Sequence, residues 1–295
     1  MESNNGIDIK DFAYCSDKYQ YTMGKSFYET GRKDTIAVFN MFYRKAPENN
    51  NWAVVSGTQE AIECIMNLGK AEPEFYERFL PGEENAGFRQ YLSTLKFTGN
   101  VYAMREGEIA FPNQPIITVE APLIEAQILE TPLLCIMNHQ MAVATKASRV
   151  CRATNRPVSE FGSRRAHGPW AATYGAKAAI IAGCASTSNI LTGVLNGVPS
   201  TGTMAHSFVT AYGSTVEGEH KAFKDYINTH HGENLILLID TYDTLKCGIL
   251  NAIRSFKECG IDNEYPYGYG VRQTLPLSMP GFHFGIIFIT LKASL

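Results

Sequence analysis

The histidine at position 206 lies in the segment STGTMAHSFV (200–209), among small residues that follow a glycine–threonine pair. Small residues let a backbone approach another group closely. Because imidazole titrates near neutral pH, His206 could act as a base, a ligand or a nucleophile. Its immediate neighbours do not distinguish these roles.

Two adjacent arginines, Arg164 and Arg165, lie in FGSRRAHG (161–168), directly after the strand-like segment VSEF (158–161). A guanidinium group binds a carboxylate or a phosphate through two parallel, charge-assisted hydrogen bonds. Adjacent side chains cannot both point the same way, so we expect at most one of them to reach into a pocket. The alternative is a structural ion pair, and His167 is expected to be a solvated or core histidine.

A cluster of small and hydroxyl residues occurs in AGCASTSN (182–189), before an expected helix. Backbone N–H groups at such a helix start can hold a phosphate. A simple helix cap is the alternative. The residues of this candidate phosphate loop are Gly183, Ser186, Thr187 and Ser188, followed by Asn189.

Two carboxylates, Asp240 and Asp243, bracket Thr241 and Tyr242 after the apolar run LILLID (235–240). Carboxylates at this place could hold Mg²⁺ or ribose hydroxyl groups. Asp243 fits the N-cap of the following helix equally well. Together with the arginines and the histidine, these groups indicate phosphate-bearing substrates without naming a reaction.

The elements that position these groups divide into two patterns. Residues 1 to about 122 mix helical segments (16–34 and 58–69) with strand-like segments (36–45, 52–57 and 99–122), which predicts an α+β domain. Residues 123–153 form a long helical stretch, in which Pro132 either kinks the helix or begins its second part.

Strand-like and helical segments alternate after this stretch, as expected of βαβ units in an α/β fold. The run 235–240 lacks alternation and so predicts a parallel strand buried on both faces. Residues 197–199 are interpreted as a strand end, and 217–228 and 244–260 as helices. Since functional groups follow the carboxyl ends of parallel strands, the three polar loops are expected to form one site.

Composition excludes several classes of protein. The 295 residues carry a formal charge of −3 and a pI near 6.2, without the basic stripe of a nucleic-acid binder. No apolar run is long enough for a membrane span, and the first residues match neither a secretory signal nor a transit peptide. Seven scattered cysteines without a CxxC pair indicate reduced thiols in a cytosolic protein.

Seven stretches, in order, resemble the nicotinate phosphoribosyltransferase family. They are SDKYQYTM (16–23), AVFNMFYRK (37–45), ATKASRV (144–150), EFGSRRAHGP (160–169), GCASTSN (183–189), GTMAHSFV (202–209) and LIDTYDTLKCGILNAI (238–253). The order of these matches argues against an unrelated phosphate-binding barrel enzyme, such as an aldolase.

The resemblance implies an N-terminal α+β domain (1–122) followed by a parallel, TIM-like α/β barrel (123–272). It implies an enzyme of NAD salvage that joins nicotinate to phosphoribosyl pyrophosphate, with ATP hydrolysis and Mg²⁺, to give nicotinate mononucleotide. The metal ligands are not assigned. A cytoplasmic homodimer with active sites shared between subunits is implied as well, with no nucleic acid or membrane as partner.

The resemblance also implies roles for single residues. His206 matches the histidine that ATP phosphorylates, and Tyr19 matches the aromatic residue that stacks on nicotinate, usually from the partner subunit. Phe161 matches a second position that contacts the ring. Arg165, in preference to Arg164, would hold the nicotinate carboxylate. The other substrate-binding residues implied are Ser207, Asp240 and Thr241.

The sequence also departs from the family. Lys18 stands where the family usually has leucine, and HGPW (167–170) where it has Gln-Gly-Pro-Asp. After GYGVR (268–272) the family continues with Asp-Ser-Gly-Asp, which residues 273–295 do not match. We therefore expect a truncation or frameshift after about residue 272, an incomplete barrel, and a chain that alone is poorly soluble and inactive in nicotinate mononucleotide synthesis, although it retains the nicotinate and phosphohistidine elements. A non-catalytic family member that at most dimerises is the alternative function.

Overall fold

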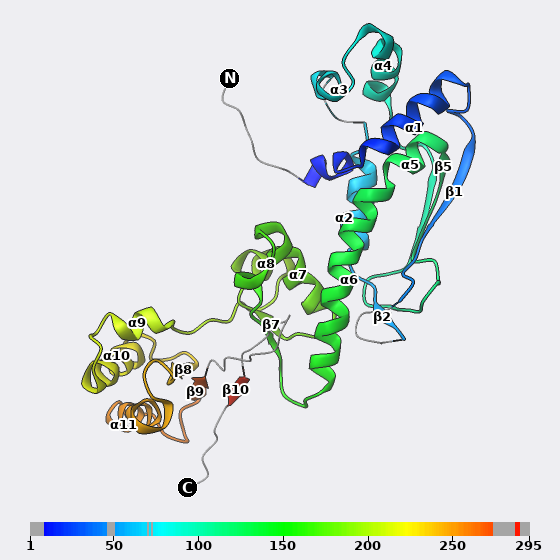
Figure 1. The fold of residues 1–295 in the computed structure, drawn as a ribbon. Coiled ribbons are helices and arrows are strands. Elements are labelled where there is room, and N and C mark those ends of the chain that lie inside the picture. Colours follow the sequence, from blue (N-terminus) through cyan, green and yellow to red (C-terminus); the bar gives the residue numbers. More distant parts are fainter. Residues whose placement is uncertain (1–8, 46–50, 70, 72, 274–286, 290–295) are drawn as a thin grey trace. The chain divides into compact units, whose positions relative to one another are not determined.

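The computed structural model describes residues 9–45, 51–69, 71, 73–273 and 287–289. The chain divides into two compact units, Met1–Pro199 and Ser200–Leu295, and each is described by itself (Figure 1). The boundary expected between residues 122 and 123 falls inside the first unit, because the helices that follow it pack on the N-terminal elements. Of the expected tail 273–295, only Gln273 and residues 287–289 are described.

The first unit begins with helices and an antiparallel sheet. The sheet has the order β1-β5-β3, and β2 pairs with β4. The elements are η1 (Ile9–Tyr14), α1 (Lys18–Glu29), β1 (Ile36–Met41), β2 (Ala53–Val54), α2 (Thr58–Met66), α3 (Pro73–Phe79), η3 (Glu83–Asn85), α4 (Ala86–Thr94), β3 (Asn100–Ala103), β4 (Ile109–Ala110) and β5 (Ile117–Pro122).

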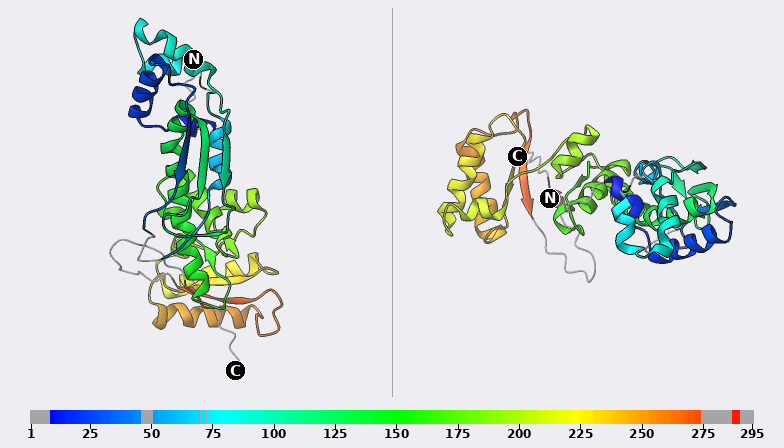
Figure 2. Two further views of the ribbon diagram at one scale, coloured as in Figure 1. Left: turned by 90° about the vertical axis from the view of Figure 1, so that its right-hand side faces the viewer. Right: turned by 90° about the horizontal axis from the view of Figure 1, so that it is seen from above.

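Side chains alternate along β5, where Ile117, Val119 and Ala121 are buried. Helix α5 (Leu123–Ile128) contacts both β1 and β5, so these side chains share one core with it. The long strands β1 and β5 run side by side in Figure 2. The sequence therefore produced the expected α+β arrangement, with period-two burial in the strands.

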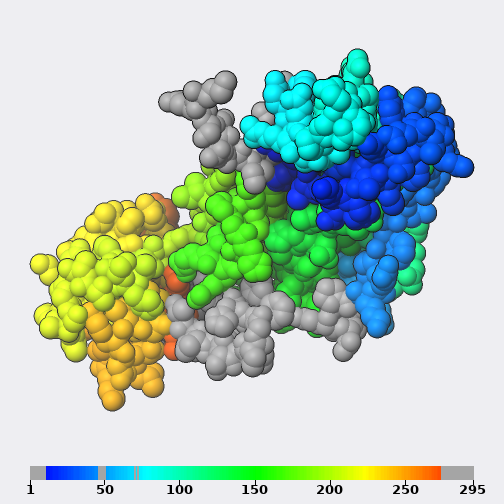
Figure 3. Space-filling model, turned by 45° about the horizontal axis from the view of Figure 1, so that its top comes forward, coloured from blue at the N-terminus to red at the C-terminus, as the bar shows by residue number. Residues whose placement is uncertain are grey.

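The segment of α3 and α4 lies against α1, as the space-filling view in Figure 3 also shows. Ring centroids of Tyr21 and Phe79 are 4.9 Å apart, and those of Tyr28 and Phe88 are 5.7 Å apart. Such aromatic pairs add stability beyond the area that they bury. Gly24 faces Phe88, and a Cβ added there would lie 3.3 Å from the ring, which is closer than most Cβ contacts.

The rest of the first unit is built on α6 (Glu130–Arg152), which contacts α2, β2 and α7 (Pro169–Ile181). Pro132 occupies the first turn of α6, where its missing N–H costs nothing, so it begins the helix and does not kink it. Strands β6 (Ser159–Glu160) and β7 (Ser186–Thr187) pair in parallel, with α7 between them in sequence. Helix α8 (Ile190–Asn196) follows.

The second unit contains α9 (His206–Thr210), α10 (Val216–Thr229), β8 (Leu235–Leu238), the π-helical turn η5 (Thr244–Gly248), α11 (Ile249–Glu258), β9 (Tyr269–Gln273) and β10 (Ile287–Ile289). Strand β8 pairs in parallel with β9, and β10 pairs antiparallel with β9. All four residues of β8 are buried, which confirms the buried strand expected from its unbroken apolar run.

The protein is thus a mixed α/β structure, as expected. Within the ranges described, the parallel pairs β6-β7 and β8-β9 belong to separate sheets, so a TIM-like barrel stays a prediction. The prediction that a strand ends at residues 197–199 was wrong. Gly197 ends α8 in the left-handed conformation, and the next two residues have no regular structure. None of the helices described is long and apolar enough to cross a bilayer.

Candidate functional site

The arginine loop begins at the end of β6 and is held by the Glu160 carboxylate. One carboxylate oxygen of Glu160 accepts a hydrogen bond from Thr187 Oγ1 at 2.7 Å, and the other accepts from the Gly162 N–H. The Arg165 N–H then donates to the Gly162 carbonyl at 2.8 Å, which closes a short 3₁₀ turn, η4 (Ser163–Arg165). The carboxylate therefore fixes where the turn starts.

A second polar residue, Asn189 at the N-cap of α8, also holds the turn. Its Oδ1 accepts from the Thr192 N–H at 3.0 Å and so caps α8, while its Nδ2 donates to Ser163 Oγ at 3.2 Å. Arg164 and Arg165 are exposed, and no carboxylate in the described part of the chain pairs with either. The structural ion pair considered as an alternative is thus not observed, and both guanidinium groups are accessible to a ligand.

The candidate phosphate loop needs a correction. Ser186 and Thr187 are buried in β7, not in a loop, and their hydroxyl groups contact Ser159 Oγ (2.7 Å) and the Glu160 carboxylate (2.7 Å). The Ser188 N–H likewise donates to the Glu160 carbonyl at 2.8 Å. The hydroxyl groups of Ser186 and Thr187 and the N–H of Ser188 therefore already have hydrogen-bond partners within or next to the parallel pair β6-β7.

Two further residues of the predicted loop differ from this buried pair. Gly183 is exposed with φ +112°, a conformation that favours glycine. The helix-cap alternative is confirmed for Asn189. A phosphate contact of this segment stays a prediction.

The two predicted ring-contacting residues both belong to the first unit. Tyr19, on α1, is 46% exposed, and its hydroxyl donates to Glu130 Oε2 at 3.0 Å. Partial desolvation, and then this hydrogen bond, raise the pKa of Tyr19. Phe161 is half-buried directly after β6. Contact of either ring with nicotinate stays a prediction.

In the second unit, the structure brings His206, Asp240 and Thr241 together. His206 is the first residue of α9, and its side chain is 48% exposed. The Nδ1 atom is 3.3 Å from Thr241 Oγ1, and Nε2 is 3.9 Å from Asp240 Oδ1. The Asp240 side chain is only 12% exposed. Ser207, the next residue on α9, is exposed.

The segment that carries Asp240 and Thr241 is tightly anchored. Asp243 Oδ1 accepts from the N–H groups of Lys246 (2.9 Å) and Leu245 (3.1 Å). The hydrogen bond from Lys246, together with that from Leu245, lowers the pKa of Asp243. The N-cap alternative is therefore confirmed. Gly248 approaches the Ile239 carbonyl so closely that an added Cβ would lie 1.8 Å from its oxygen.

Arg272, on β9, was missed by the sequence reasoning. It is 6% exposed, and its Nη1 donates to Thr203 Oγ1 at 3.0 Å and to the Met204 carbonyl at 3.4 Å. It thus supports the segment that precedes His206. Its position in the alternating strand YGVRQ is the signal that could have found it, because residues of one face alternate with those of the other.

A buried ionic cluster around Lys177 was also missed. Lys177 Nζ, on α7, lies 2.6 Å from Glu60 Oε1 and 3.4 Å from Glu106 Oε2. The second Glu60 oxygen accepts from Gln140 Nε2 at 3.1 Å, and Glu106 accepts from the Gly57 N–H at 2.8 Å. The cluster therefore ties α7 to α2, α6 and the β3–β4 turn, within the unit that carries the arginines.

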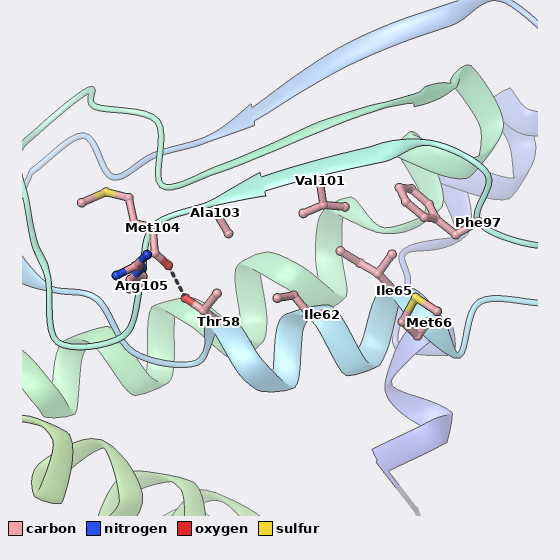
Figure 4. A pocket seen from close by; sticks show the side chains of 9 residues that line it. All are labelled: Thr58, Ile62, Ile65, Met66, Phe97, Val101, Ala103, Met104 and Arg105. Atoms are coloured by element: carbon pink, nitrogen blue, oxygen red, sulfur yellow. Dashed lines mark hydrogen bonds between the residues drawn. The ribbon is translucent and has the colours of Figure 1, made fainter.

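A cavity of about 440 Å³ lies elsewhere in the first unit, between α2 and β3 (Figure 4). Its walls are mainly apolar, and Thr58 Oγ1 donates to the Met104 carbonyl at 3.1 Å beside it. The lining residues are Thr58, Ile62, Ile65, Met66, Phe97, Val101, Ala103, Met104 and Arg105. None of them is a predicted site residue, and the cavity lacks the cluster of polar groups that the proposed chemistry needs.

No group of three or more histidine, cysteine, aspartate or glutamate side chains in the described ranges could hold a metal ion. Mg²⁺ in phosphate-transfer sites is commonly held by one or two carboxylates together with substrate phosphates. Asp240, which does not serve as a helix cap, is compatible with such a role, whereas Asp243 is occupied by two backbone N–H groups.

Comparison with known proteins matches residues 15–138 to the nicotinate phosphoribosyltransferase N-terminal domain. The chain is 43% identical over 258 residues to the nicotinate phosphoribosyltransferase of Bacillus subtilis, covering 86% of this chain and 51% of that protein. An enzyme of the same name from Mycobacterium tuberculosis is 38% identical over 250 residues, covering 84% of this chain and 52% of the relative.

Solved structures agree with these relatives. Human nicotinic acid phosphoribosyltransferase matches with a TM-score of 0.76 and 29% identity, covering 87% of this chain and 60% of that one. A nicotinate-nucleotide pyrophosphorylase from Pyrococcus furiosus shares the fold with a TM-score of 0.67 at 22% identity, covering 93% of this chain and 70% of that one. The chain spans about half the length of the curated relatives just described. It belongs to the nicotinate phosphoribosyltransferase family.

Proposed function

We propose that the chain takes part in the transfer of a phosphoribosyl group from phosphoribosyl pyrophosphate to nicotinate, coupled to ATP hydrolysis. The nicotinate ring nitrogen would bond to the sugar's anomeric carbon as pyrophosphate leaves, giving nicotinate mononucleotide for NAD synthesis. The observation that carries the proposal is the group of His206, Asp240 and Thr241, in a chain whose relatives bear this enzyme's name.

The chemistry of His206 follows from its surroundings. A neutral imidazole nitrogen is a competent nucleophile toward the γ-phosphorus of ATP. The new N–P bond forms as the bond between that phosphorus and the bridging oxygen breaks, releasing ADP. Water then hydrolyses the phosphohistidine to inorganic phosphate. Exposure of 48% of the His206 side chain leaves room for the phosphoryl group.

The two ring nitrogens of His206 are not equivalent. A phosphoryl group on Nε2 would stand beside the Asp240 carboxylate, which is 3.9 Å from this nitrogen. Two like unit charges about 4 Å apart repel by about 4 kcal/mol at an effective dielectric constant near 20. A phosphoryl group on Nδ1 would instead meet the Thr241 hydroxyl, 3.3 Å from Nδ1, which can donate to it. We therefore favour Nδ1 as the nucleophile, with the Nε2 proton toward Asp240.

Arg165 is proposed to bind the nicotinate carboxylate, with Arg164 as the second choice. Its guanidinium group is accessible, and its backbone is fixed by the Gly162 hydrogen bond. A bidentate pair with a carboxylate distinguishes nicotinate from nicotinamide, because an amide offers one acceptor and no charge. Ser207, Phe161 and Tyr19 remain proposed substrate contacts.

ATP and Mg²⁺ are part of the same proposal. When bound, Mg²⁺ would neutralise charge on the substrate phosphates. Asp240 is the carboxylate that we propose to hold it or the ribose hydroxyl groups. The backbone N–H groups of Gly183 and Ser188 donate to the carbonyls of Ile180 (3.0 Å) and Glu160 (2.8 Å), and the hydroxyl groups of Ser186 and Thr187 are engaged as well. The phosphate contact that we propose for this segment is therefore through the Ser188 hydroxyl group.

The assembly and location of the protein are proposed from the family and the thiols. We propose that the parallel pairs contribute to a TIM-like barrel, and that the enzyme is a homodimer with shared active sites. All seven cysteines are free thiols, which is typical of the cytoplasm. The alternative function is a non-catalytic family member that at most dimerises with a longer partner.

Labelling with [γ-³²P]ATP tests the phosphoryl transfer directly. We expect an acid-labile label on the wild-type chain and its loss in His206→Ala. The matched control is His167→Ala, which removes another exposed histidine and should leave the label unchanged. A label that persists in His206→Ala would refute the role of His206, and failure to label the wild-type chain would favour the non-catalytic alternative.

Calorimetric titration with nicotinate tests the arginine assignment separately. Arg165→Met should weaken nicotinate binding at least tenfold, since a bidentate charged contact is lost, while nicotinamide binding should change little. Arg164→Met is the matched control, because it removes the same charge from the adjacent position. Equal effects of the two substitutions would overturn the assignment of Arg165.

A further inference from the structure

Two cysteine thiols meet in the first unit at a distance from which they can react. Cys151 lies in the last turn of α6, and Cys184 lies in the short connection between α7 and β7. Their Sγ atoms are 3.7 Å apart, within hydrogen-bonding distance for sulfur. Neither thiol belongs to the proposed transfer chemistry.

The backbone beside Cys184 lies in van der Waals contact with Cys151. A Cβ added to Gly183 would lie 3.8 Å from Cys151 Cβ and 3.9 Å from its Sγ. A disulfide has an S–S bond of about 2.05 Å, so the sulfurs need to approach by roughly 1.6 Å. Rotation of the two χ1 angles and a small shift at Gly183, which is exposed, can supply this approach.

We propose that Cys151 and Cys184 are a peroxide-sensitive thiol pair that forms a reversible disulfide. The Cys151 thiolate would attack one oxygen of hydrogen peroxide, breaking the O–O bond and giving a sulfenic acid and hydroxide. The Cys184 sulfur then attacks the Cys151 sulfur and displaces a second hydroxide, which takes up the Cys184 proton. In total, two thiols and one hydrogen peroxide give one disulfide and two waters.

The exposure of the two sulfurs sets this order of events. Cys151 is half-buried, whereas Cys184 is 8% exposed. Burial, followed by the neighbouring Cys151, raises the pKa of Cys184 to about 12. Peroxide therefore reaches Cys151 first, and Cys184, 3.7 Å away, acts as the resolving thiol.

The disulfide would act on the strand that supports the arginine turn. The Ala185 N–H, directly after Cys184, donates to the Val158 carbonyl at 2.8 Å, next to β6. A covalent link would fasten this connection to α6. We expect slower hydrogen exchange at residues 183–188 in the oxidised chain than in the reduced chain.

The test treats the full chain with hydrogen peroxide, alkylates the remaining thiols with iodoacetamide and maps the tryptic peptides. Cleavage after Arg149, Arg152, Lys177 and Lys221 places Cys151 in residues 150–152 and Cys184 in residues 178–221. We expect these two peptides linked and lighter by two hydrogens than their sum, with release by dithiothreitol. Cys151→Ser should abolish the link, whereas the control Cys259→Ser should keep it.

Two outcomes would overturn the proposal. One is a Cys184 that remains fully alkylated while Cys151 proceeds to sulfinic acid, which would show that the pair cannot close. The other is a disulfide of either cysteine with a third residue in preference to its neighbour. Circular dichroism of Cys151→Ser establishes that the variant is folded, and a reduced wild-type sample without peroxide gives the baseline. Because no activity is measured, the result does not depend on the proposed function.

Discussion

Replacement of Lys177 by methionine should destabilise the first unit strongly. Lys177 is the cation between Glu60 and Glu106, at 2.6 and 3.4 Å. Methionine keeps most of the apolar volume of the lysine but removes its charge. Two carboxylates would then remain in a site where the Glu60 and Glu106 side chains are only 7% and 22% exposed.

The magnitude follows from the burial of this cluster. Removal of one partner from a buried ion pair typically costs about 3–5 kcal/mol, because a charge is left without compensation. The lower end is expected here, because Gln140 still donates to Glu60 and Glu106 is the more exposed carboxylate. About 3 kcal/mol is a large part of a total stability of about 5–15 kcal/mol. For a unit of this size it corresponds to a fall in Tm of roughly 6–12 °C.

Thermal and urea unfolding of the variant measure this cost. Lys177→Arg is the matched control, because it keeps the charge and should lose much less. The double variant Lys177→Met/Glu60→Gln should be more stable than the sum of the single effects predicts, since a neutral amide in place of the Glu60 carboxylate no longer needs a cation. A loss below about 1 kcal/mol in Lys177→Met would refute the inference that the cluster is desolvated.

Three further predictions concern the second unit. Asp243→Ala should lower the midpoint of urea unfolding because two capped N–H groups lose their acceptor, while Asp243→Asn should retain most of the stability. Gly248→Ala should abolish folding of the unit, seen as lost circular dichroism, because its Cβ would overlap the Ile239 carbonyl. Hydrogen bonds from Lys224 and Arg254 lower the pKa of Glu258 from 4.5 to about 2. The stability that they provide is therefore complete above about pH 4.5 and lost as the pH falls through about 2, and acid unfolding of Glu258→Gln should lack this contribution.

Local sequence rules predicted the helix starts and the buried strand well. Asp243 and Asn189 cap helices as their residue types suggest, and the four residues of β8 are buried as an unbroken apolar run requires. The expectation that the loop after the buried strand lies beside His206 is confirmed for Asp240 and Thr241, although the strand expected before His206 is absent, and the meeting of the arginine loop with them stays a prediction. These features depend on a few neighbouring residues or on one strand end.

Features that depend on contacts between distant segments were not predicted. A run of serine and threonine residues fits a phosphate loop, a helix cap or a buried strand equally well. Only the pairing of β7 with β6 shows that Ser186 and Thr187 belong to a buried strand. Lys177 lies in a helix of small apolar residues, and nothing near it in the sequence signals a buried cation. Its partners come from α2 and the β3–β4 turn, 117 and 71 residues away along the chain.

The two units share one way of presenting a reactive group. After β6, Glu160 uses its carboxylate on the Thr187 hydroxyl and the Gly162 N–H, and the adjacent turn leaves the Arg165 guanidinium accessible. After β8, Asp243 uses its carboxylate on two backbone N–H groups, and the preceding Thr241 lies beside His206. In each case one acidic residue fixes the backbone through hydrogen bonds. A neighbouring side chain is therefore held in place while its own polar atoms stay accessible to a ligand or to a second residue. A carboxylate close to a strand end therefore indicates a binding site for a metal ion or a substrate only if its oxygens are not already occupied by backbone N–H groups.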